Sequence, residues 1–249
     1  MLVYEEKFPV LQPECDLNGR FTLGGILRAT QQAGTDQCEK LGVGGAYMLH
    51  FGAAWILAKV SVEVYGELRD GDRLRIVTEP FAPVHAVYQR VTSFYGESGA
   101  LLAQTDARWI MADIRTRHIL RRPPEGMVLP FQAESDKEHS LTIFRASELT
   151  PGGEATASYS QCDINRHMNN TRYADLLCDA LPLTEWEAGN YAQKAVINFR
   201  SELPLGGTMQ LARGEVEADG RKGWYVTGTA GGTRCFEANL FLQSCGGEA

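Results

Sequence analysis

The sequence of 249 residues lacks the features that mark membrane-spanning and secreted proteins. No apolar run approaches the roughly 18 residues of a membrane-spanning helix. Residues 1–7 have neither the basic start nor the apolar core of a signal peptide. Hydrophobic residues make up 44% of the chain and charged residues 22%, which is typical of a folded protein rather than a disordered one. We therefore expect a cytoplasmic protein that does not enter a membrane.

Basic charge and metal-binding motifs are also scarce. The formal net charge is −7, which argues against general nucleic-acid binding because phosphate contacts need a basic surface. No pair of the six cysteines has the C-x-x-C spacing. We expect them to be small buried hydrophobic residues, including Cys162 beside Asp163. The sequence has no glycine-rich phosphate motif and no His/Cys metal spacing, so we predict no cofactor and no metal.

One polar stretch, residues 163–173 (DINRHMNNTRY), stands out. Asp163, Asn165 and His167 stand at alternate positions, and in extended backbone such side chains share a face. We therefore expect these three groups, which can bind or move protons, to point the same way. Asp and Asn are also common as helix caps and turn formers, so the stretch alone leaves a purely structural role open.

Apolar residues at spacings of three and four follow the polar stretch and predict a helix over residues 170–181. Asn169 or Asn170 is the expected N-cap, and Pro182 is expected to end the helix. Free backbone N–H groups at a helix start favour a developing negative charge. The pattern therefore predicts acid/base groups beside an oxyanion hole.

The chain contains two copies of one unit. Residues 15–18 (CDLN) recur as residues 162–165 (CDIN), so the second copy begins 162 − 15 = 147 positions later. Downstream, the pattern K…EL…G of residues 59–71 recurs at residues 194–206, from 59 to 194, an offset of 135. Two short matches in the same order, embedded in the same pattern of elements, indicate an internal duplication.

Each copy reads as one strand, one long helix and four antiparallel strands, which predicts an α+β fold with two curved sheets. Glycines 24, 25 and 34 make the first helix thin and predict a close packing partner. The sheets are expected to meet edge to edge or the helices side by side. We predict a first domain over 1–130, a linker over 131–153 and a second domain over 154–249. The expected helices are 22–41 and 170–181, and the expected strands are 3–12, 56–64, 74–76, 86–95, 101–112, 192–202, 208–218, 223–229 and 233–243.

The two copies differ in one chemically important residue. At the offset of 147, Arg20 stands where His167 stands, and only the imidazole exchanges a proton near pH 7. This assigns the chemistry to the second copy and leaves the first to build a pocket. Glu202, at a strand end, occupies the position of Glu67 in the first copy. A solvated turn carboxylate is the alternative interpretation of Glu202.

Asp163 followed by Asn165-x-His167-x-Asn169-Asn170-x-x-Tyr173 resembles the signature of the acyl-acyl-carrier-protein (acyl-ACP) thioesterases. Glu202 matches that family's catalytic glutamate. The resemblance covers nearly the whole chain. Its first domain is matched by the opening stretch Tyr4 to Gln31, by Trp109-Ile110-Met111, and by Asp113, Thr116 and Pro123. It implies a tandem double hotdog fold, in which each half is a curved antiparallel sheet around a long helix.

The resemblance implies hydrolysis of the thioester of fatty acyl-ACP, which releases a free fatty acid in fatty acid biosynthesis. It assigns the catalytic residues as Asp163, Asn165, His167 and Glu202. Glu202, with His167, would activate a water, while Asn165 and the helix start hold the thioester oxygen and Asp163 orients its neighbours. Plant members usually carry a cysteine directly after the glutamate, where this sequence has Leu203. Water is therefore the expected nucleophile.

The implied partner is acyl carrier protein with its phosphopantetheine-linked acyl chain. Carrier proteins are acidic, so docking needs a local basic face. One candidate face is Arg115, Arg117, Arg121 and Arg122, and another is Arg166 with Arg172. Exposed sheet edges would also allow a homodimer. Tyr47, Met48, Phe51 and Trp55 are candidates for the acyl pocket.

Three other functions remain open at this point. An acyl-CoA thioesterase would have the same fold and chemistry. A hotdog hydratase would pair an Asp with a His but would leave Glu202 without a role. A non-catalytic acyl-binding protein would bind a fatty acyl chain without releasing thiol.

Overall fold

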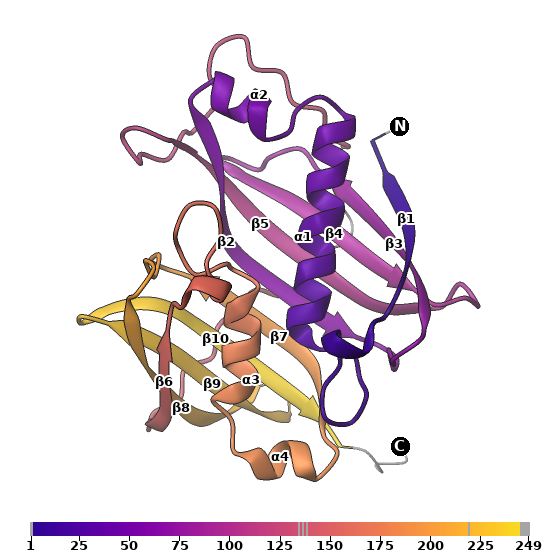
Figure 1. Cartoon of the computed structure of the whole chain (residues 1–249), viewed down its shortest axis with the longest axis vertical. Coiled ribbons are helices and arrows are strands. Elements are labelled where there is room, and N and C mark those ends of the chain that lie inside the picture. The colour runs from indigo at the N-terminus through magenta and orange to yellow at the C-terminus, as the bar shows by residue number, and fades with distance from the viewer. Residues whose placement is uncertain (1, 134, 136, 138, 219, 245–249) are drawn as a thin grey trace.

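The computed structural model describes residues 2–133, 135, 137, 139–218 and 220–244. Its strands form one continuous antiparallel sheet in the order β1-β3-β4-β5-β2-β7-β10-β9-β8-β6. The two halves join where β2 pairs with β7, with Lys59 opposite Asn198 and Glu63 opposite Lys194. The edge-to-edge arrangement that the repeat predicted is therefore present, and it merges the two expected sheets into one (Figure 1).

The two halves have the same order of elements. The first half consists of β1 (Tyr4–Pro9), α1 (Leu23–Lys40), α2 (Gly45–His50), β2 (Ala53–Val64), β3 (Arg73–Pro80), β4 (Val87–Tyr95) and β5 (Leu101–Asp113). The second consists of β6 (Thr150–Thr156), α3 (Arg172–Asp179), α4 (Leu183–Glu187), β7 (Tyr191–Phe199), β8 (Thr208–Ala218), β9 (Arg221–Ala230) and β10 (Thr233–Gln243). Short 3₁₀ helices, Gln12–Glu14 and Tyr159–Gln161, precede α1 and α3.

The predicted first helix is confirmed, whereas the second is shorter than predicted. Helix α1 begins after Thr22, whose side chain accepts the Gly25 N–H. The N-cap of α3 is Thr171, so the prediction of Asn169 or Asn170 is wrong. The Asn169 side chain instead accepts the N–H and hydroxyl of Thr171, which holds the chain in a turn before the helix starts. Strand β6 begins at Thr150, inside the predicted linker of residues 131–153.

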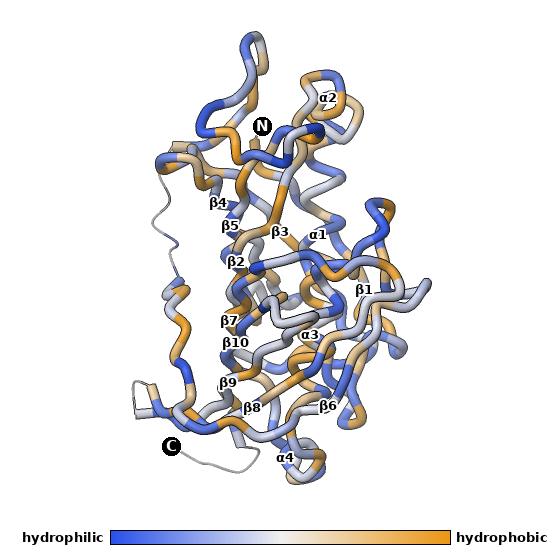
Figure 2. The backbone as a smooth tube through the Cα atoms, turned by 90° about the vertical axis from the view of Figure 1, so that its left-hand side faces the viewer, coloured by the Kyte–Doolittle hydropathy of each residue, from blue (hydrophilic) through white to orange (hydrophobic). Residues whose placement is uncertain are grey.

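Helices α1 and α3 lie side by side on one face of the sheet, while the linker crosses the other face (Figures 1 and 2). The glycine-rich face of α1 makes this close approach possible. A Cβ atom at Gly24 would lie only 1.8 Å from the Asp175 Oδ1 of α3. Arg28 of α1 donates a hydrogen bond of 3.0 Å to the same carboxylate. The close partner that the thin helix predicted is therefore the second helix as well as the sheet.

Two hydrophobic clusters fill the molecule. The larger lies between the helices and the sheet and includes residues of both halves. The smaller lies in the first half alone, around α2 and strands β2, β4 and β5. Its buried members are Met48, Ala53, Tyr88, Met111 and Met127, and Tyr47, Phe51 and Trp55 pack against them. All four candidate acyl-pocket residues thus belong to one cluster.

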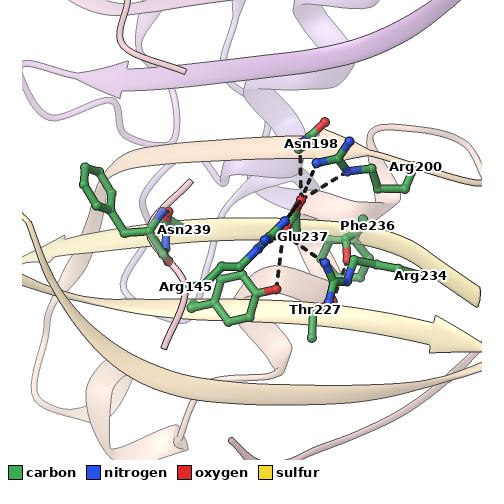
Figure 3. Close-up of polar contacts among 10 residues, drawn as sticks. Arg145, Asn198, Arg200, Thr227, Arg234, Phe236, Glu237 and Asn239 are labelled. Atoms are coloured by element: carbon green, nitrogen blue, oxygen red, sulfur yellow. Dashed lines mark hydrogen bonds and ion pairs between the residues drawn. The ribbon is translucent and has the colours of Figure 1, made fainter. Parts of the chain in front are cut away.

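The linker is fastened to the outer face of the sheet by buried polar groups. Asn239 of β10 exchanges two hydrogen bonds with the Phe144 backbone, at 2.7 and 2.8 Å. Arg145 pairs with the Glu237 carboxylate, which Arg200, Arg234 and the Tyr225 hydroxyl also contact (Figure 3). Residues 139–149 of the linker form neither helix nor strand, so these side-chain contacts are what hold them on the sheet.

Candidate active site

The polar stretch forms a tight turn rather than an extended strand. The Asp163 Oδ1 accepts the backbone N–H groups of Asn165 at 2.9 Å and of His167 at 3.4 Å. Arg166 has φ 64°, in the left-handed region, which reverses the chain between them. The expectation of extended backbone is therefore wrong. The Asp163 and Asn165 side chains still meet, with 3.4 Å between Asp163 Oδ2 and Asn165 Nδ2. An Asp side chain that bonds the backbone two residues on favours a turn over extended structure.

The turn is the second copy of a structure also present in the first half. Asp16 Oδ1 accepts the N–H groups of Asn18 and Arg20 at 2.8 and 2.9 Å, as Asp163 does at the repeat-matched positions. The Met168 N–H donates to the Leu203 carbonyl at 2.9 Å, and the matching Phe21–Leu68 bond is 2.8 Å. The duplication predicted from two short sequence matches therefore extends to individual backbone hydrogen bonds.

This pairing brings His167 and Glu202 together. His167 forms a backbone bridge with Pro204, next to the loop that carries Glu202. The Nδ1 of His167 lies 3.5 Å from the Glu202 Oε2. The imidazole is mostly covered, with 20% of its side-chain surface exposed, whereas the carboxylate is 49% exposed. A covered imidazole next to a carboxylate in contact with water is an arrangement suited to proton transfer.

Arg117 of the first half also contacts Glu202, and sequence analysis had placed it only in a docking face. Its Nη1 donates to Oε1 at 3.1 Å and to Oε2 at 2.8 Å. Arg117 lies in the turn after β5, which Asp113 builds by accepting the N–H groups of Arg115 and Thr116. These hydrogen bonds hold the pKa of Asp113 below its usual range. The family resemblance includes Asp113 and Thr116, but nothing in the sequence indicates the contact across 85 residues.

The start of α3 offers less to an oxyanion than the sequence predicted. The N–H groups of Arg172, Tyr173 and Ala174 donate to carbonyls three residues earlier. The Thr171 N–H donates to the Asn169 side chain. These four N–H groups already have acceptors, so the prediction that free N–H groups of the helix start form an oxyanion hole is wrong for residues 171–174. The half-turn before a short helix satisfies its own donors by 3₁₀-type bonds.

Asn165 carries a side-chain donor on the same turn as His167. It is exposed, and its Nδ2 lies 3.4 Å from the Asp163 Oδ2. That long bond occupies at most one of its two N–H groups. Leu203, at the position of the plant cysteine, is 1% exposed and lies in the main core. A nucleophile at position 203 is therefore absent, in agreement with the sequence analysis.

A covered arginine occupies the equivalent place in the first half. Arg20 lies 3.7 Å from Glu67, as His167 lies near Glu202. The Arg20 Nη1 donates to the Gly189 carbonyl at 2.8 Å, and its guanidinium lies over the Tyr191 ring. The segment after α4 thus covers Arg20, which is 8% exposed. At this point the first copy has a covered arginine in place of the imidazole, while its Glu67 side chain is 47% exposed.

No cluster of possible metal ligands occurs among the described residues. A surface hollow of about 390 Å³ lies on the linker face, with Glu63, Lys194 and Phe144 among its lining residues. It is lined by none of the four candidate catalytic residues. In the part of the chain that the structure covers, the helices are too short or too polar to cross a membrane.

Two family models match the chain. The model of the acyl-ACP thioesterase N-terminal domain matches residues 1–128, and that of the acyl-ACP thioesterase C-terminal domain matches residues 152–233. The second match contains the His167–Glu202 pair and the whole 163–173 stretch.

Curated relatives and solved structures agree with these matches. The chain is 23% identical over 202 residues to a chloroplastic palmitoyl-acyl carrier protein thioesterase of Gossypium hirsutum, covering 73% of this chain and 48% of the relative. It therefore spans about half the length of the curated relatives it matches. A solved structure from Lactobacillus plantarum superposes with a TM-score of 0.86 at 19% identity, covering 98% of this chain and 97% of that one. The 12:0-ACP thioesterase of Umbellularia californica superposes with a TM-score of 0.80 at 16% identity, covering 98% and 95%. These likenesses confirm the predicted double hotdog fold.

Proposed function

The chain belongs to the acyl-ACP thioesterase family, and on this premise we propose that it hydrolyses the thioester of fatty acyl-ACP and releases a free fatty acid. The observation that carries the proposal is the 3.5 Å approach of His167 to Glu202 in the second copy of the repeat. The first copy, with Arg20 in place of the histidine, serves as an internal contrast. Acid/base chemistry then belongs to one site per chain.

In the proposed mechanism, water is the nucleophile. Glu202, with His167 beside it, accepts a proton from water as the oxygen attacks the thioester carbonyl carbon. Negative charge then builds on the carbonyl oxygen, towards which the exposed Asn165 amide donates. Collapse of this intermediate breaks the C–S bond, and the proton passes to the leaving thiolate. Asp163 acts indirectly, because it holds the turn that carries both Asn165 and His167.

The acyl chain is proposed to bind in the first half, in the small cluster around α2. Strand β5 supports this placement, since it supplies Met111 to the cluster and then leads into the turn that contacts Glu202. Three methionines, Met48, Met111 and Met127, lie buried there. Unbranched thioether side chains adapt readily to an inserted alkyl chain.

Acyl carrier protein is the proposed partner, docked through the arginines around the site. Arg115, Arg121, Arg122 and Arg166 are exposed, whereas Arg172 already pairs with Asp175. Reversal of charge at Arg121 and Arg122 is expected to raise the KM for carrier-bound substrate and to leave that for acyl-pantetheine unchanged, because only the carrier is acidic. An unchanged KM for the carrier-bound substrate would reject this face. A homodimer and a cytoplasmic location stay predictions.

Thiol release from acyl-ACP by wild type, His167→Ala and Glu202→Gln tests the proposal. Both variants are expected to lose at least about 100-fold in kcat while keeping the wild-type unfolding transition. Glu67→Gln is the matched control, because Glu67 has the same place in the repeat and also contacts arginines. It is expected to retain wild-type turnover. Near wild-type rates in both site variants would dispose of the assignment.

Two rival functions have distinct outcomes in the same assay. Faster thiol release from acyl-CoA than from acyl-ACP would favour an acyl-CoA thioesterase of the same fold. Binding of a fatty acyl chain without any thiol release would favour a non-catalytic acyl-binding protein. The His167–Glu202 pair argues against the second outcome, since a binding protein has no need of it.

A further inference from the structure

We infer that Arg117 is a positioning residue for the reaction, by which the first half of the chain fixes the Glu202 carboxylate of the second half against His167. The inference rests on the proposed function and deepens it, because Arg117 lies outside the 163–173 stretch and Glu202, on which the family resemblance of the second half depends. It also gives the first half a role at the reacting end of the substrate, in addition to the acyl pocket.

The geometry of the Arg117–Glu202 contact supports a positioning role. Both Glu202 oxygens accept hydrogen bonds from the single Nη1 nitrogen of Arg117, at 3.1 and 2.8 Å, which holds the carboxylate facing the guanidinium. Among the residues that the structure describes, the carboxylate also meets the His167 side chain, at 3.5 Å. Glu202 sits on a loop just after β7 and is about half exposed, so little packing restrains its three side-chain torsions. Arg117 is therefore the strongest restraint on the direction of the base.

The backbone of Arg117 is the second argument. Its φ of 61° lies in the left-handed region, which glycine adopts at no cost and an arginine adopts at a cost. The N–H groups of Arg115 and Thr116 donate to Asp113 and fix this turn, so the loop imposes the left-handed backbone on Arg117. An arginine kept where glycine fits better indicates that its side chain is used.

The exposure of the pair is the third argument. The arginine side chain is 65% exposed and the glutamate side chain 49%. Ion pairs so open to water contribute little to folding stability. The contact therefore serves to orient the carboxylate rather than to hold the two halves together, which the continuous β2–β7 pairing already does.

Arg117→Gly separates the two roles, because it removes the guanidinium and relieves the turn. We expect wild-type or slightly higher thermal stability, a kcat for acyl-ACP hydrolysis lower by about 10- to 100-fold and a KM within about twofold of wild type. Arg117→Lys, which keeps one charged donor, is expected to recover part of the lost kcat. Arg73→Ala, which removes the same charge from an exposed position at the start of β3 and outside both candidate docking faces, is the control and is expected to keep the wild-type kcat.

A second measurement does not depend on turnover. The NMR signals of the His167 ring are expected to shift in Arg117→Gly in the same direction as in Glu202→Gln, because both variants take the carboxylate away from the imidazole. Arg73→Ala should leave them in place. A wild-type kcat in Arg117→Gly, an equal loss in Arg73→Ala, or unchanged His167 signals would each overturn the inference. Absence of thiol release by the wild-type protein would instead refute the proposed function, and the His167 signals would still decide the role of Arg117.

Discussion

The buried carboxylate of Glu237 provides a quantitative prediction about stability. Its side chain is fully buried and contacts the guanidiniums of Arg145, Arg200 and Arg234 (Figure 3). Hydrogen bonds from Arg145, opposed by burial and reinforced by those from Arg200, lower the pKa of Glu237 from 4.5 to about 2. Through Arg145 and Arg200, this cluster fixes both the linker and the residue directly after β7, two residues before Glu202. We therefore expect Glu237 to make the fold sensitive to acid.

The sign and size follow from proton linkage. A carboxyl with a lowered pKa in the folded protein stabilises it above the unfolded pKa, near 4.5, and that stability is lost as the pH falls towards about 2. A difference of this size corresponds to about 3 kcal/mol. The guanidiniums are 44–58% exposed, so solvent screens them. We accordingly expect about 2 kcal/mol.

Denaturant unfolding of wild type and Glu237→Gln at a series of pH values measures this effect. Between pH 4.5 and 2 the free energy of unfolding of the wild type should fall by about 2 kcal/mol more than that of Glu237→Gln. Other carboxylates titrate in both proteins and cancel in the difference. Glu97→Gln, in the exposed turn between β4 and β5, should follow the wild type. Parallel curves for wild type and Glu237→Gln would refute the reasoning.

Two further substitutions test the packing of α1 and the acyl pocket. Gly24→Ala would force the Asp175 side chain away from α1 and is expected to lower the free energy of unfolding by about 1–2 kcal/mol, whereas Gly45→Ala, which meets open space, should not lower it. A harmless Gly24→Ala would contradict the close approach of α1 and α3. Met48→Trp should fill the small cluster and lower kcat/KM for long acyl chains about 10-fold relative to short ones. An unchanged ratio of the two would place the acyl chain elsewhere.

The duplication was the most productive signal in the sequence. It predicted the order of elements in both halves, and it matched Glu202 to Glu67 and His167 to Arg20. The structure brings the members of each glutamate pair together, His167 with Glu202 at 3.5 Å and Arg20 with Glu67 at 3.7 Å. The same repeated plan placed strands such as β8 and β10 correctly. These predictions succeeded because two copies of one unit bury equivalent faces in a common core.

Local polar chemistry and long-range contacts were harder to predict. The 163–167 stretch was expected to be extended, yet the Asp163 side chain competes with strand pairing and closes a turn. Helix α3 was expected to start at Asn169 or Asn170, but Asn169 caps the turn before it. The Arg117–Glu202 contact spans 85 residues, and no periodicity in the sequence relates its two members.

The most direct test of a single hydrolytic site in the second copy is thiol release from carrier-bound acyl chains by Glu202→Gln and Glu67→Gln, measured side by side. The account predicts that the first variant loses at least about 100-fold in kcat and that the second hydrolyses acyl-ACP as fast as the wild type. Equal loss in the two variants, or equal activity, would contradict it, because the imidazole would then have no part in distinguishing the two halves.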